Sequence, residues 1–328
     1  MNIGLTYDLR SQYLAQGYNE ESTAEFDRDD TIDAIEQTLQ SLGHATFRIG
    51  NHYELVRQLS EGKRWDLVFN IAEGLYGIGR EAQVPAVLDA FQIPYTFSDP
   101  MVMSLTLHKA MTKRVIRDAG LPTPDFALLE HPQDIASVDF PPPYFIKPVA
   151  EGTGKGITSA SIIHERKELA ARSAALIKTY RQRVLVERFL PGREFTVGIV
   201  GTGPDAEVLG TIEVVLRDNA EPGVYSYVNK EQCEELVEYR LVSPEKNPSV
   251  KEAESISLAA WKILECRDGG RIDLRCDEHG RPQFIEINPL AGLHPEHSDL
   301  PIICNLLGIP YIKLIEKILT SACERVNT

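Results

Sequence analysis

The segment from Arg271 to Asn288 carries the residues best suited to chemistry. It reads Arg-Ile-Asp-Leu-Arg-Cys-Asp-Glu-His-Gly-Arg-Pro-Gln-Phe-Ile-Glu-Ile-Asn, and its alternating runs around an Asp-, Gly- and Pro-containing turn predict a β-hairpin. The alternation places Arg271 and Asp273 on one face of the first strand, and the next strand turns Glu286 and Asn288 to a common face. If the two faces coincide, Asp273, Glu286 and Asn288 form an oxygen cluster that suits Mg²⁺ shared with substrate phosphates. The alternative is a solvated hairpin face with scattered charges.

A glycine-rich stretch follows a predicted strand at Tyr144–Pro148. Lys147 lies at the end of this strand, and residues 151–156 read Glu-Gly-Thr-Gly-Lys-Gly. Closely spaced glycines let backbone N–H groups approach an anion. The spacing of a P-loop is absent, and a strand at Thr158–Ile163 is predicted to follow instead of a helix. The stretch is interpreted as a flap between two antiparallel strands, and a plain hairpin tip is the alternative.

A third segment, Leu185–Glu194, could contact a nucleotide base. Glu187 closes a strand of buried type, and Phe189 and Leu190 follow closely enough to enclose a flat ring. Such a segment offers backbone groups to an adenine edge while a carboxylate accepts the ribose hydroxyls. The alternative is an ordinary strand end with a Pro-Gly turn and surface charges.

The composition of the 328-residue chain limits the classes of function. Its hydrophobic fraction of 43% and charged fraction of 25% are ordinary for a soluble globular protein of two or three domains. A net charge of −14 argues against nucleic acid or an anionic membrane as the main partner. The five cysteines are scattered and lack C-x-x-C spacing, which predicts reduced thiols, a cytoplasmic protein and no zinc site. No signal peptide or transmembrane span is predicted.

The first hundred residues alternate strands and helices. The patterns predict strands at Ile3–Tyr7, Ala45–Ile49, Trp65–Ile71 and Ile93–Phe97, and helices at Asp29–Leu42, His52–Glu61 and Glu81–Phe91. This order favours an α/β fold with a parallel sheet covered on both faces. The polar stretch Leu9–Arg28 is expected to be a loop at the carboxyl end of the first strand, where such sheets bind ligands.

The remainder of the chain mixes strands and helices less regularly. A single helix is expected from Met101 to Ala119, and a polar loop is expected at Asp218–Lys230. Further helices are predicted at Glu165–Arg181, Ser249–Glu265 and Ile312–Ala322, and strands at Val184–Glu187, Glu194–Val200 and Val208–Val215.

In this order the three segments resemble the ATP-grasp superfamily, and most closely its D-alanine–D-alanine ligase branch. The stretch Lys109-x-x-x-Lys113 with its following Ala-Gly-Leu-Pro-Thr-Pro is similar to the family's helix and turn, and Tyr225–Lys230 is similar to its mobile loop. The resemblance covers nearly the whole chain. It implies an α/β architecture, α+β in part, of three domains: an N-terminal Rossmann-like parallel sheet (1–103), a small central flap domain (104–183) and a C-terminal antiparallel-sheet domain with the metal hairpin (184–328). A homodimer is expected from the family alone.

The resemblance also implies roles for individual residues. Arg271 and the backbone N–H of Gly292 would stabilise an oxyanion, and Lys230 would reach the γ-phosphate of ATP. Two Mg²⁺ ions, for which Mn²⁺ could substitute, would be bound by Asp273, Glu286 and Asn288. The nucleotide would contact Lys109, Lys147, Glu151, Gly152, Thr153, Gly154, Gly156, Glu187, Arg188, Phe189, Leu190 and Glu194. The implied reaction is the ATP-dependent, ADP-forming joining of a carboxylate to an amine through an acyl phosphate.

The substrate end departs from the family's pattern. Glu73 replaces a usual histidine, and His297, with Ser298 next to it, replaces the serine that normally receives a substrate carboxylate. The region before Asp29 is longer and more acidic than usual. We therefore expect small-molecule acid and amine substrates, with amino acids favoured, and these departures leave open whether both substrates are D-alanine. The candidate substrate contacts are Glu25, Glu73, His294, His297 and Ser298, and a surface or capping role is the alternative for each histidine.

Other classes of function are weaker interpretations of the same residues. An ATP-grasp phosphotransferase would share every nucleotide residue and lack only the amine substrate. A nucleotide sensor without turnover is disfavoured, because binding alone rarely needs the complete set of lysines and metal ligands. A dinucleotide dehydrogenase is excluded because no Gly-x-Gly-x-x-Gly follows the first strand.

Overall fold

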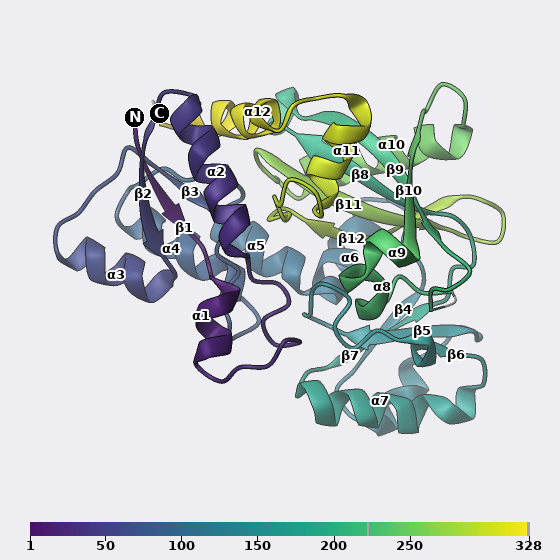
Figure 1. The fold of residues 1–328 in the computed structure, drawn as a ribbon. Helices are drawn as coiled ribbons and strands as arrows, with labels where there is room; N and C mark the ends of the chain where they lie inside the picture. The colour runs from purple at the N-terminus through teal and green to yellow at the C-terminus, as the bar shows by residue number, and fades with distance from the viewer. Residues whose placement is uncertain (222, 327–328) are drawn as a thin grey trace.

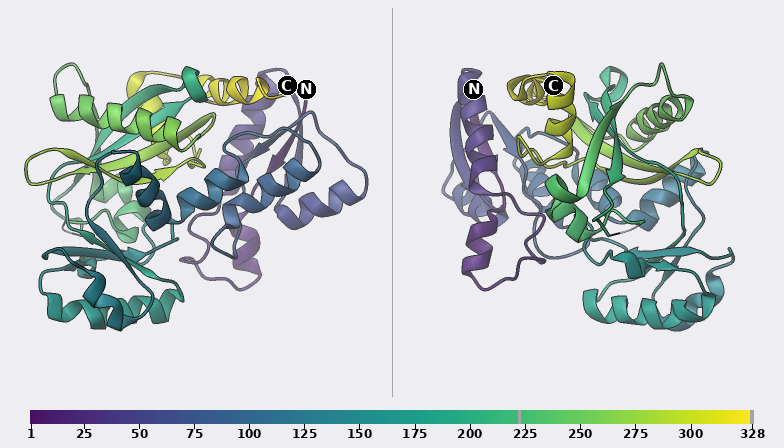
Figure 2. Two further views of the ribbon diagram at one scale, coloured as in Figure 1. Left: turned by 180° about the vertical axis from the view of Figure 1, so that it is seen from behind. Right: turned by 45° about the vertical axis from the view of Figure 1, so that its right-hand side comes forward.

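The computed structural model describes residues 1–221 and 223–326 and arranges them around three sheets (Figure 1). The N-terminal unit, the central unit and the C-terminal unit meet along the middle of the molecule. Seen from behind, α5 (Pro100–Leu107) and α6 (Lys109–Asp118) run across this middle (Figure 2). Within the described residues, every helix is too short or too polar to span a lipid bilayer.

The N-terminal unit has the predicted parallel sheet. β1 (Asn2–Thr6) lies between β2 (Ala45–Gly50) and β3 (Leu67–Asn70). α2 (Asp29–Ser41) packs on one face together with the C-terminal helix α12 (Tyr311–Cys323), whereas α3 (His52–Ser60) and α4 (Gln83–Ala90) pack on the other. The expected cover on both faces is confirmed.

The predicted strand at Ile93–Phe97 is wrong. Only one bridge forms there, between Tyr95 and Val68. Phe97 adopts a left-handed backbone conformation with φ of 72°, and its N–H donates to the buried carboxylate of Asp268 at 2.6 Å. The chain therefore turns away from the sheet toward the C-terminal unit.

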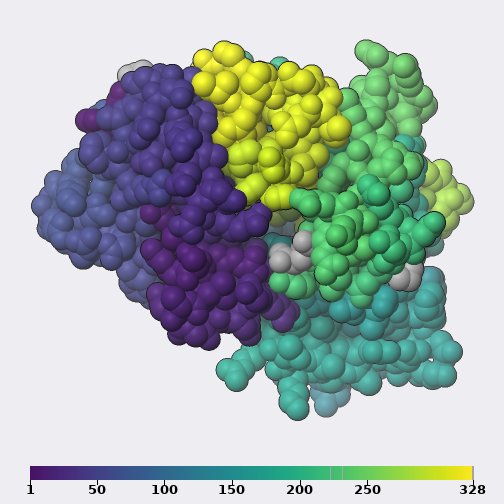
Figure 3. Space-filling view, in the orientation of Figure 1, coloured from purple at the N-terminus to yellow at the C-terminus, as the bar shows by residue number. Residues whose placement is uncertain are grey.

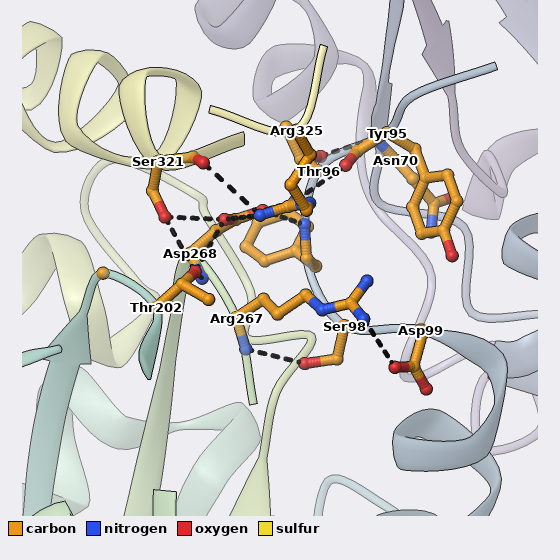
Figure 4. A network of polar contacts seen from close by, with 12 residues as sticks. Asn70, Tyr95, Thr96, Ser98, Asp99, Thr202, Arg267, Asp268, Ser321 and Arg325 are labelled. Carbon is orange, nitrogen blue, oxygen red and sulfur yellow. Dashed lines mark hydrogen bonds and ion pairs between the residues drawn. The ribbon is translucent and has the colours of Figure 1, made fainter. Parts of the chain in front are cut away.

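The buried carboxylate of Asp268 joins the N-terminal and C-terminal units (Figure 4). Arg325, on the segment after α12, donates to both of its oxygens at 2.7 and 2.6 Å. The hydroxyls of Ser321 and Thr202 donate to one of these oxygens at 2.8 and 3.2 Å. Every donor except the Phe97 N–H comes from the C-terminal unit, so this cluster fixes the edge of the N-terminal unit to it.

The helix expected from Met101 to Ala119 is two helices, α5 (Pro100–Leu107) and α6 (Lys109–Asp118). His108 breaks the helix with a non-helical backbone, and its side chain accepts the N–H of Met111 at 3.2 Å as a cap of α6. The break frees the N–H of Lys109, which donates to Val149 at 3.1 Å. The interruption thus brings Lys109 against the flap of the central unit.

The central unit is an antiparallel sheet with one long helix. Its strand order is β4 (Phe126–Leu129), β7 (Val184–Arg188), β5 (Tyr144–Pro148) and β6 (Ile162–Ile163), and α7 (Arg166–Tyr180) packs against it. β5 and β6 pair antiparallel, which confirms the flap between two strands. β6 is shorter than expected because a 3₁₀ turn capped by Thr158 precedes it. This sheet includes β7 and so crosses the expected limit at residue 184; the three domain ranges remain predictions.

The C-terminal unit holds the metal-type hairpin in a five-stranded antiparallel sheet. Its strand order is β10 (Val237–Val242), β9 (Glu207–Leu216), β8 (Glu194–Val200), β11 (Gly269–Cys276) and β12 (Pro282–Asn288). α10 (Pro248–Ile263) packs on one face, and α11 (Asp299–Leu307) contacts β8 and β9.

Several short elements were absent from the sequence-based expectation. They are α1 (Arg10–Ala15) inside the predicted Leu9–Arg28 loop, α8 (Tyr227–Glu231) at the end of the predicted Asp218–Lys230 loop, α9 (Cys233–Leu236), β4, β10 and α11. The buried Tyr13 holds the helix α1 in place, since its hydroxyl donates to Asp8 at 2.5 Å and its ring packs against Phe26 with centres 4.5 Å apart.

Candidate active site

The hairpin β11–β12 brings the predicted metal ligands together. Asp273 pairs with Glu286 and Arg271 pairs with Asn288 across the two strands, so the two polar faces coincide as expected. A bulge follows Asp273. The hydroxyl of Thr196, on the neighbouring strand β8, donates to one oxygen of Asp273 at 2.8 Å. The neighbouring strands therefore fix the orientation of the Asp273 carboxylate.

The donor set of the hairpin fits Mg²⁺. It offers two carboxylates and one amide, and the side-chain nitrogen of Asn288 is buried without a hydrogen-bond partner among the described residues. Within those residues no group of three His, Cys, Asp or Glu side chains is arranged to hold a metal ion. Mg²⁺ is commonly held by one or two carboxylates together with substrate phosphates, and Asp273 and Glu286 are two such carboxylates.

The pKa of Glu286 is lowered by the cations around it. Burial alone would raise that pKa, but Lys109, Lys147, Lys230 and Arg271 outweigh the effect of burial. The carboxylate of Glu286 is therefore ionised at neutral pH, as a metal ligand must be.

Two lysines from different elements, the helix α6 and the strand β5, converge on Glu286. The ammonium of Lys109, at the start of α6, lies 3.5 Å from Glu286 and donates to the backbone oxygen of Glu151 at 2.6 Å. The ammonium of Lys147, at the end of β5, lies 3.9 Å from Glu286. Both side chains are almost fully buried. Two positive charges beside a hairpin with carboxylates can neutralise the charge of a polyphosphate, and the predicted contacts of these lysines with ATP remain predictions.

Glu187 is buried between two lysines. Its carboxylate lies 2.7 Å from Lys113 and 2.9 Å from Lys147. Burial would raise the pKa of Glu187, but the two ammonium groups lower it below its usual value. Lys113 also donates to the backbone oxygen of Phe284 at 2.9 Å. In this structure Glu187 therefore positions Lys147, and its predicted contact with the nucleotide remains a prediction.

A small cavity of about 80 Å³ lies beside Glu187, between the central and C-terminal units. Apolar side chains enclose it together with the carboxylates of Glu187 and Glu194, the apolar ones being Phe145, Ile157, Phe189, Leu190 and Ile285. The guanidinium of Arg275 lies 5.2 Å from the ring centre of Phe189 and 3.3 Å from Glu194. Sequence analysis gave Arg275 no role, although it shares a strand face with Asp273. Arg188 is exposed and pairs with Glu278 at 3.1 Å.

The glycine flap is closed against two neighbouring segments. A Cβ atom on Gly152 would lie 2.1 Å from a carboxylate oxygen of Glu25, and one on Gly154 would lie 2.9 Å from the backbone nitrogen of Tyr227. Thr153, Gly154 and Gly156 have positive φ angles of 49°, 73° and 75°. The flap thus needs small residues where it meets the N-terminal unit and the 225–230 segment.

Sequence analysis missed two cations that bind Glu25 at this junction. Arg80 donates to both carboxylate oxygens of Glu25 at 3.1 and 2.9 Å, and Lys155 of the flap lies 3.3 Å from one of them. Lys155 also pairs with Glu151 at 2.7 Å. The sequence signal for Lys155 was a charged residue among flap glycines, whereas Arg80 gave none.

A larger cavity of about 740 Å³ opens where the three units meet. Purple N-terminal, green and yellow C-terminal segments converge around this hollow (Figure 3). Its lining includes Arg271, Asn288, Gly292, Lys109 and Lys230. All five predicted substrate contacts line it as well: Glu25, Glu73, His294, His297 and Ser298. The structure thus brings the predicted catalytic and substrate residues to one cavity.

The post-hairpin loop is held by its own polar groups. The Nδ1 atom of His294 accepts the backbone N–H groups of Glu296 and His297 at 3.2 and 3.3 Å, and its Nε2 atom lies 3.3 Å from Asp30. The two imidazole rings stack with centres 4.4 Å apart. The hydroxyl of Ser298 accepts the N–H of His294 at 2.9 Å. His294 therefore has the capping role that was the alternative for it. The side chain of His297 is the more exposed of the two.

Comparison with known proteins assigns this arrangement to a family. Residues 115–320 match the sequence profile described as D-ala D-ala ligase C-terminus. A D-alanine–D-alanine ligase of Aquifex aeolicus is 34% identical over 88% of this chain and 92% of its own length. The chain belongs to the D-alanine–D-alanine ligase family. A ligase of the same name from Bordetella petrii is 34% identical over 80% of this chain and 78% of its own.

Solved structures share the fold of this family member. The D-alanine–D-alanine ligase of Bacillus anthracis superimposes with a TM-score of 0.76 at 20% identity, covering 100% of this chain and 99% of the other. The VanG D-Ala:D-Ser ligase of Enterococcus faecalis gives 0.74 at 18% identity, covering 98% and 99%. The expected ATP-grasp resemblance and fold class are confirmed, while the roles of single residues remain predictions.

Proposed function

We propose that this protein is an ATP-dependent, ADP-forming ligase that joins the carboxylate of one small molecule to the amine of another, with amino acids as the favoured substrates. Family membership supports the reaction class. The structural observation that carries the proposal is the convergence of Lys109 and Lys147 on the hairpin carboxylate of Glu286. Lys109 and Glu286 line the 740 Å³ cavity, whereas Lys147, Asp273 and Glu286 line the small cavity beside Glu187. ATP is also present in one solved structure of the Bacillus anthracis relative, which has a TM-score of 0.71 to this chain.

The nucleotide would lie between the central and C-terminal units. Its base would enter the small apolar cavity beside Phe189, and its phosphates would replace Glu286 as the partners of Lys109 and Lys147. Two Mg²⁺ ions, held by Asp273, Glu286 and Asn288 together with the phosphates, would neutralise charge on the phosphoryl group during transfer. The remaining nucleotide contacts would come from the flap residues 151–156.

Arg271 would stabilise the reacting carboxyl group. Its guanidinium is held by Asp273 and Asp299, each at 2.9 Å, and it lines the cavity beside Gly292. Burial would lower the pKa of Arg271, but these carboxylates raise it, so the side chain stays charged. A fixed cation and a backbone N–H aimed at one oxygen are the usual means of stabilising a tetrahedral oxyanion. Lys230, 4.8 Å from the Tyr225 ring centre, would approach the γ-phosphate.

The carboxylate substrate would receive the γ-phosphoryl group, releasing ADP and giving an acyl phosphate. The amine would then attack its carbonyl carbon and release inorganic phosphate. The closed flap would shield the acyl phosphate from water, because hydrolysis would waste it. Substrates would contact Glu73, His297 and Ser298. We expect the enzyme to act in the cytoplasm as a homodimer.

The dependence of ADP release on both substrates tests the proposal. We expect ADP release with ATP, Mg²⁺ and an acid–amine pair of amino acids, and mass spectrometry should detect the condensed product. Hydroxylamine added with the acid alone should trap the acyl phosphate as a hydroxamate. ADP release with an acid alone, giving a stable phosphorylated product, would contradict ligation and favour a phosphotransferase.

A further inference from the structure

Three carboxyl groups in the large cavity lack partners. Asp27 precedes α2, Glu73 follows β3, and Glu81 lies in the short turn Arg80–Ala82. All three are half-buried and line the cavity. Within residues 1–221 and 223–326, none of these side chains makes an ion pair or a hydrogen bond. Their oxygens are therefore open to a ligand.

The neighbouring carboxylate of Glu25, in contrast, already has cationic partners. Arg80 and Lys155 both bind it, and the closed flap covers it at Gly152. A positive group that enters the cavity therefore finds Glu25 already neutralised. The three open carboxyl groups are the acceptors left on this wall.

The open carboxyl groups also repel one another. Burial raises the pKa of Glu73 well above its usual value, and Glu81 and Glu25 raise it further. Burial raises the pKa of Glu81 to about 7. A cation placed among them would relieve both the desolvation and the repulsion.

The surroundings indicate an organic cation. The three carboxyl groups line the same cavity as Arg271, Gly292 and Lys109, which is the proposed site of the organic substrates. The phosphates of ATP are provided with Lys109 and Lys147 elsewhere in the proposed site. An ammonium or guanidinium group on a substrate fits the shape and the charge.

We propose that one of the two substrates carries a positively charged side chain, which Asp27, Glu73 and Glu81 bind. The inference rests on the proposed ligase function, because Arg271, Lys109 and Gly292 are what make this cavity a substrate site. The three carboxyl groups determine only which side-chain charge the site prefers in a substrate. An amino acid with a neutral side chain brings a single ammonium group, which is fewer than these acceptors can hold.

Equilibrium binding tests the charge preference without turnover. The full-length protein would be saturated with Mg²⁺ and a non-hydrolysable ATP analogue, then titrated by calorimetry with lysine and ornithine in both chiral forms. Norleucine, which matches lysine in length and lacks the charge, is the matched ligand. We expect the preferred basic amino acid to bind at least tenfold more tightly than norleucine, as one charge-assisted contact provides.

Variants then assign the preference to the three carboxyl groups. Glu73→Gln and Glu81→Gln keep the shape of each side chain, and each should lower the lysine-to-norleucine affinity ratio by roughly tenfold. Glu54→Gln on α3 removes an exposed carboxylate outside the cavity and should leave the ratio unchanged. Equal affinity for lysine and norleucine, or an unchanged ratio in both cavity variants, would overturn the proposal.

Turnover separates this inference from the proposed function. Tight binding of a basic amino acid without ADP release from any acid–amine pair would leave the cation site standing and refute the ligase. ADP release and product formation with neutral pairs, at the kcat/KM of basic pairs, would support the ligase and refute the cation site.

Discussion

Replacing Asp268 by Asn should loosen the N-terminal unit from the C-terminal unit (Figure 4). Asp268 is fully buried and accepts hydrogen bonds from Phe97, Arg325, Ser321 and Thr202. Asparagine has the same shape and tolerates the left-handed backbone at this position, where φ is 64°. The substitution therefore removes the negative charge with little change in backbone strain.

The magnitude follows from the burial of the ion pair. Removing one partner of a buried pair costs about 3–5 kcal/mol, because the other charge is left uncompensated. The side chain of Arg325 is 25% exposed, so water can solvate part of its charge. We therefore expect a loss at the lower end of that range, about 3 kcal/mol of the free energy of unfolding.

The two tryptophans of the chain allow each unit to be followed separately. Trp65 lies in the N-terminal core and Trp261 in the core of the C-terminal unit. Urea unfolding would be measured by fluorescence in single-tryptophan proteins carrying Trp65→Phe or Trp261→Phe. With Asp268→Asn, the transition reported by Trp65 should shift to lower urea and precede the one reported by Trp261.

An exposed ion pair supplies the control. Asp33, which pairs with Arg48 on the surface, has 51% of its side chain exposed, and Asp33→Asn should change stability by less than about 1 kcal/mol. Coincident transitions at the parent midpoint in the Asp268→Asn proteins would refute the argument that this carboxylate couples the two units.

Arg271→Lys should lower kcat by roughly 10²–10³-fold, because it removes a donor fork aimed at the oxyanion. Steady-state kinetics measure this, and an unchanged kcat would exclude the role. Glu187→Gln should weaken ATP binding at least tenfold and destabilise the fold by about 3–5 kcal/mol, since two buried lysines lose their shared carboxylate. Calorimetry would measure the loss of binding and urea unfolding the loss of stability. Wild-type values in both would contradict the role of Glu187 in positioning Lys147. Burial, with help from Asp8 and Asp30, raises the pKa of Asp27 to about 8. The folded state then holds this proton more tightly than the unfolded chain, so stability falls as pH rises from about 4 to about 8. Asp27→Asn should flatten that fall in thermal unfolding between pH 4 and 9, whereas parallel curves for the two proteins would count against it.

The parts of the site set by local pattern were predictable from the sequence. Strand alternation and a turn of known chemistry predicted the hairpin and the polar faces of its two strands. The direct pairing of Asp273 with Glu286 also depends on the bulge after Asp273, which the pattern did not indicate. The flap was predictable for the same reason, since glycines separated two apolar strands. These features depend on residues close to each other in the chain.

The parts set by distant contacts were not predictable. Arg80 and Glu25 are 55 positions apart, and Phe97 and Asp268 are 171 apart. No periodicity marks such partners, because each contact exists only after the units have packed. The helix break at His108 belongs to the same class: the 101–119 segment has a continuous helical pattern, and the contact of Lys109 with Val149 stabilises the interruption.

Some buried carboxyl groups of this chain accept several hydrogen bonds, and others have no donor within the part of the chain that the structure describes. This difference supports a functional role for the carboxyl groups without donors. Asp268 is completely buried and has donors from four residues, so the chain can satisfy a carboxylate that serves packing. Asp27 and Glu73 are partly buried and have no such donors among the described residues. Natural sequences accept local violations of this kind chiefly at functional sites. If Asp27→Asn stabilises the protein at pH 8 and also weakens binding of a basic amino acid, stability has been sacrificed there for recognition of a positive charge. If it stabilises the protein and leaves binding unchanged, the carboxyl group is a defect of packing and the substrate's charge must be recognised elsewhere.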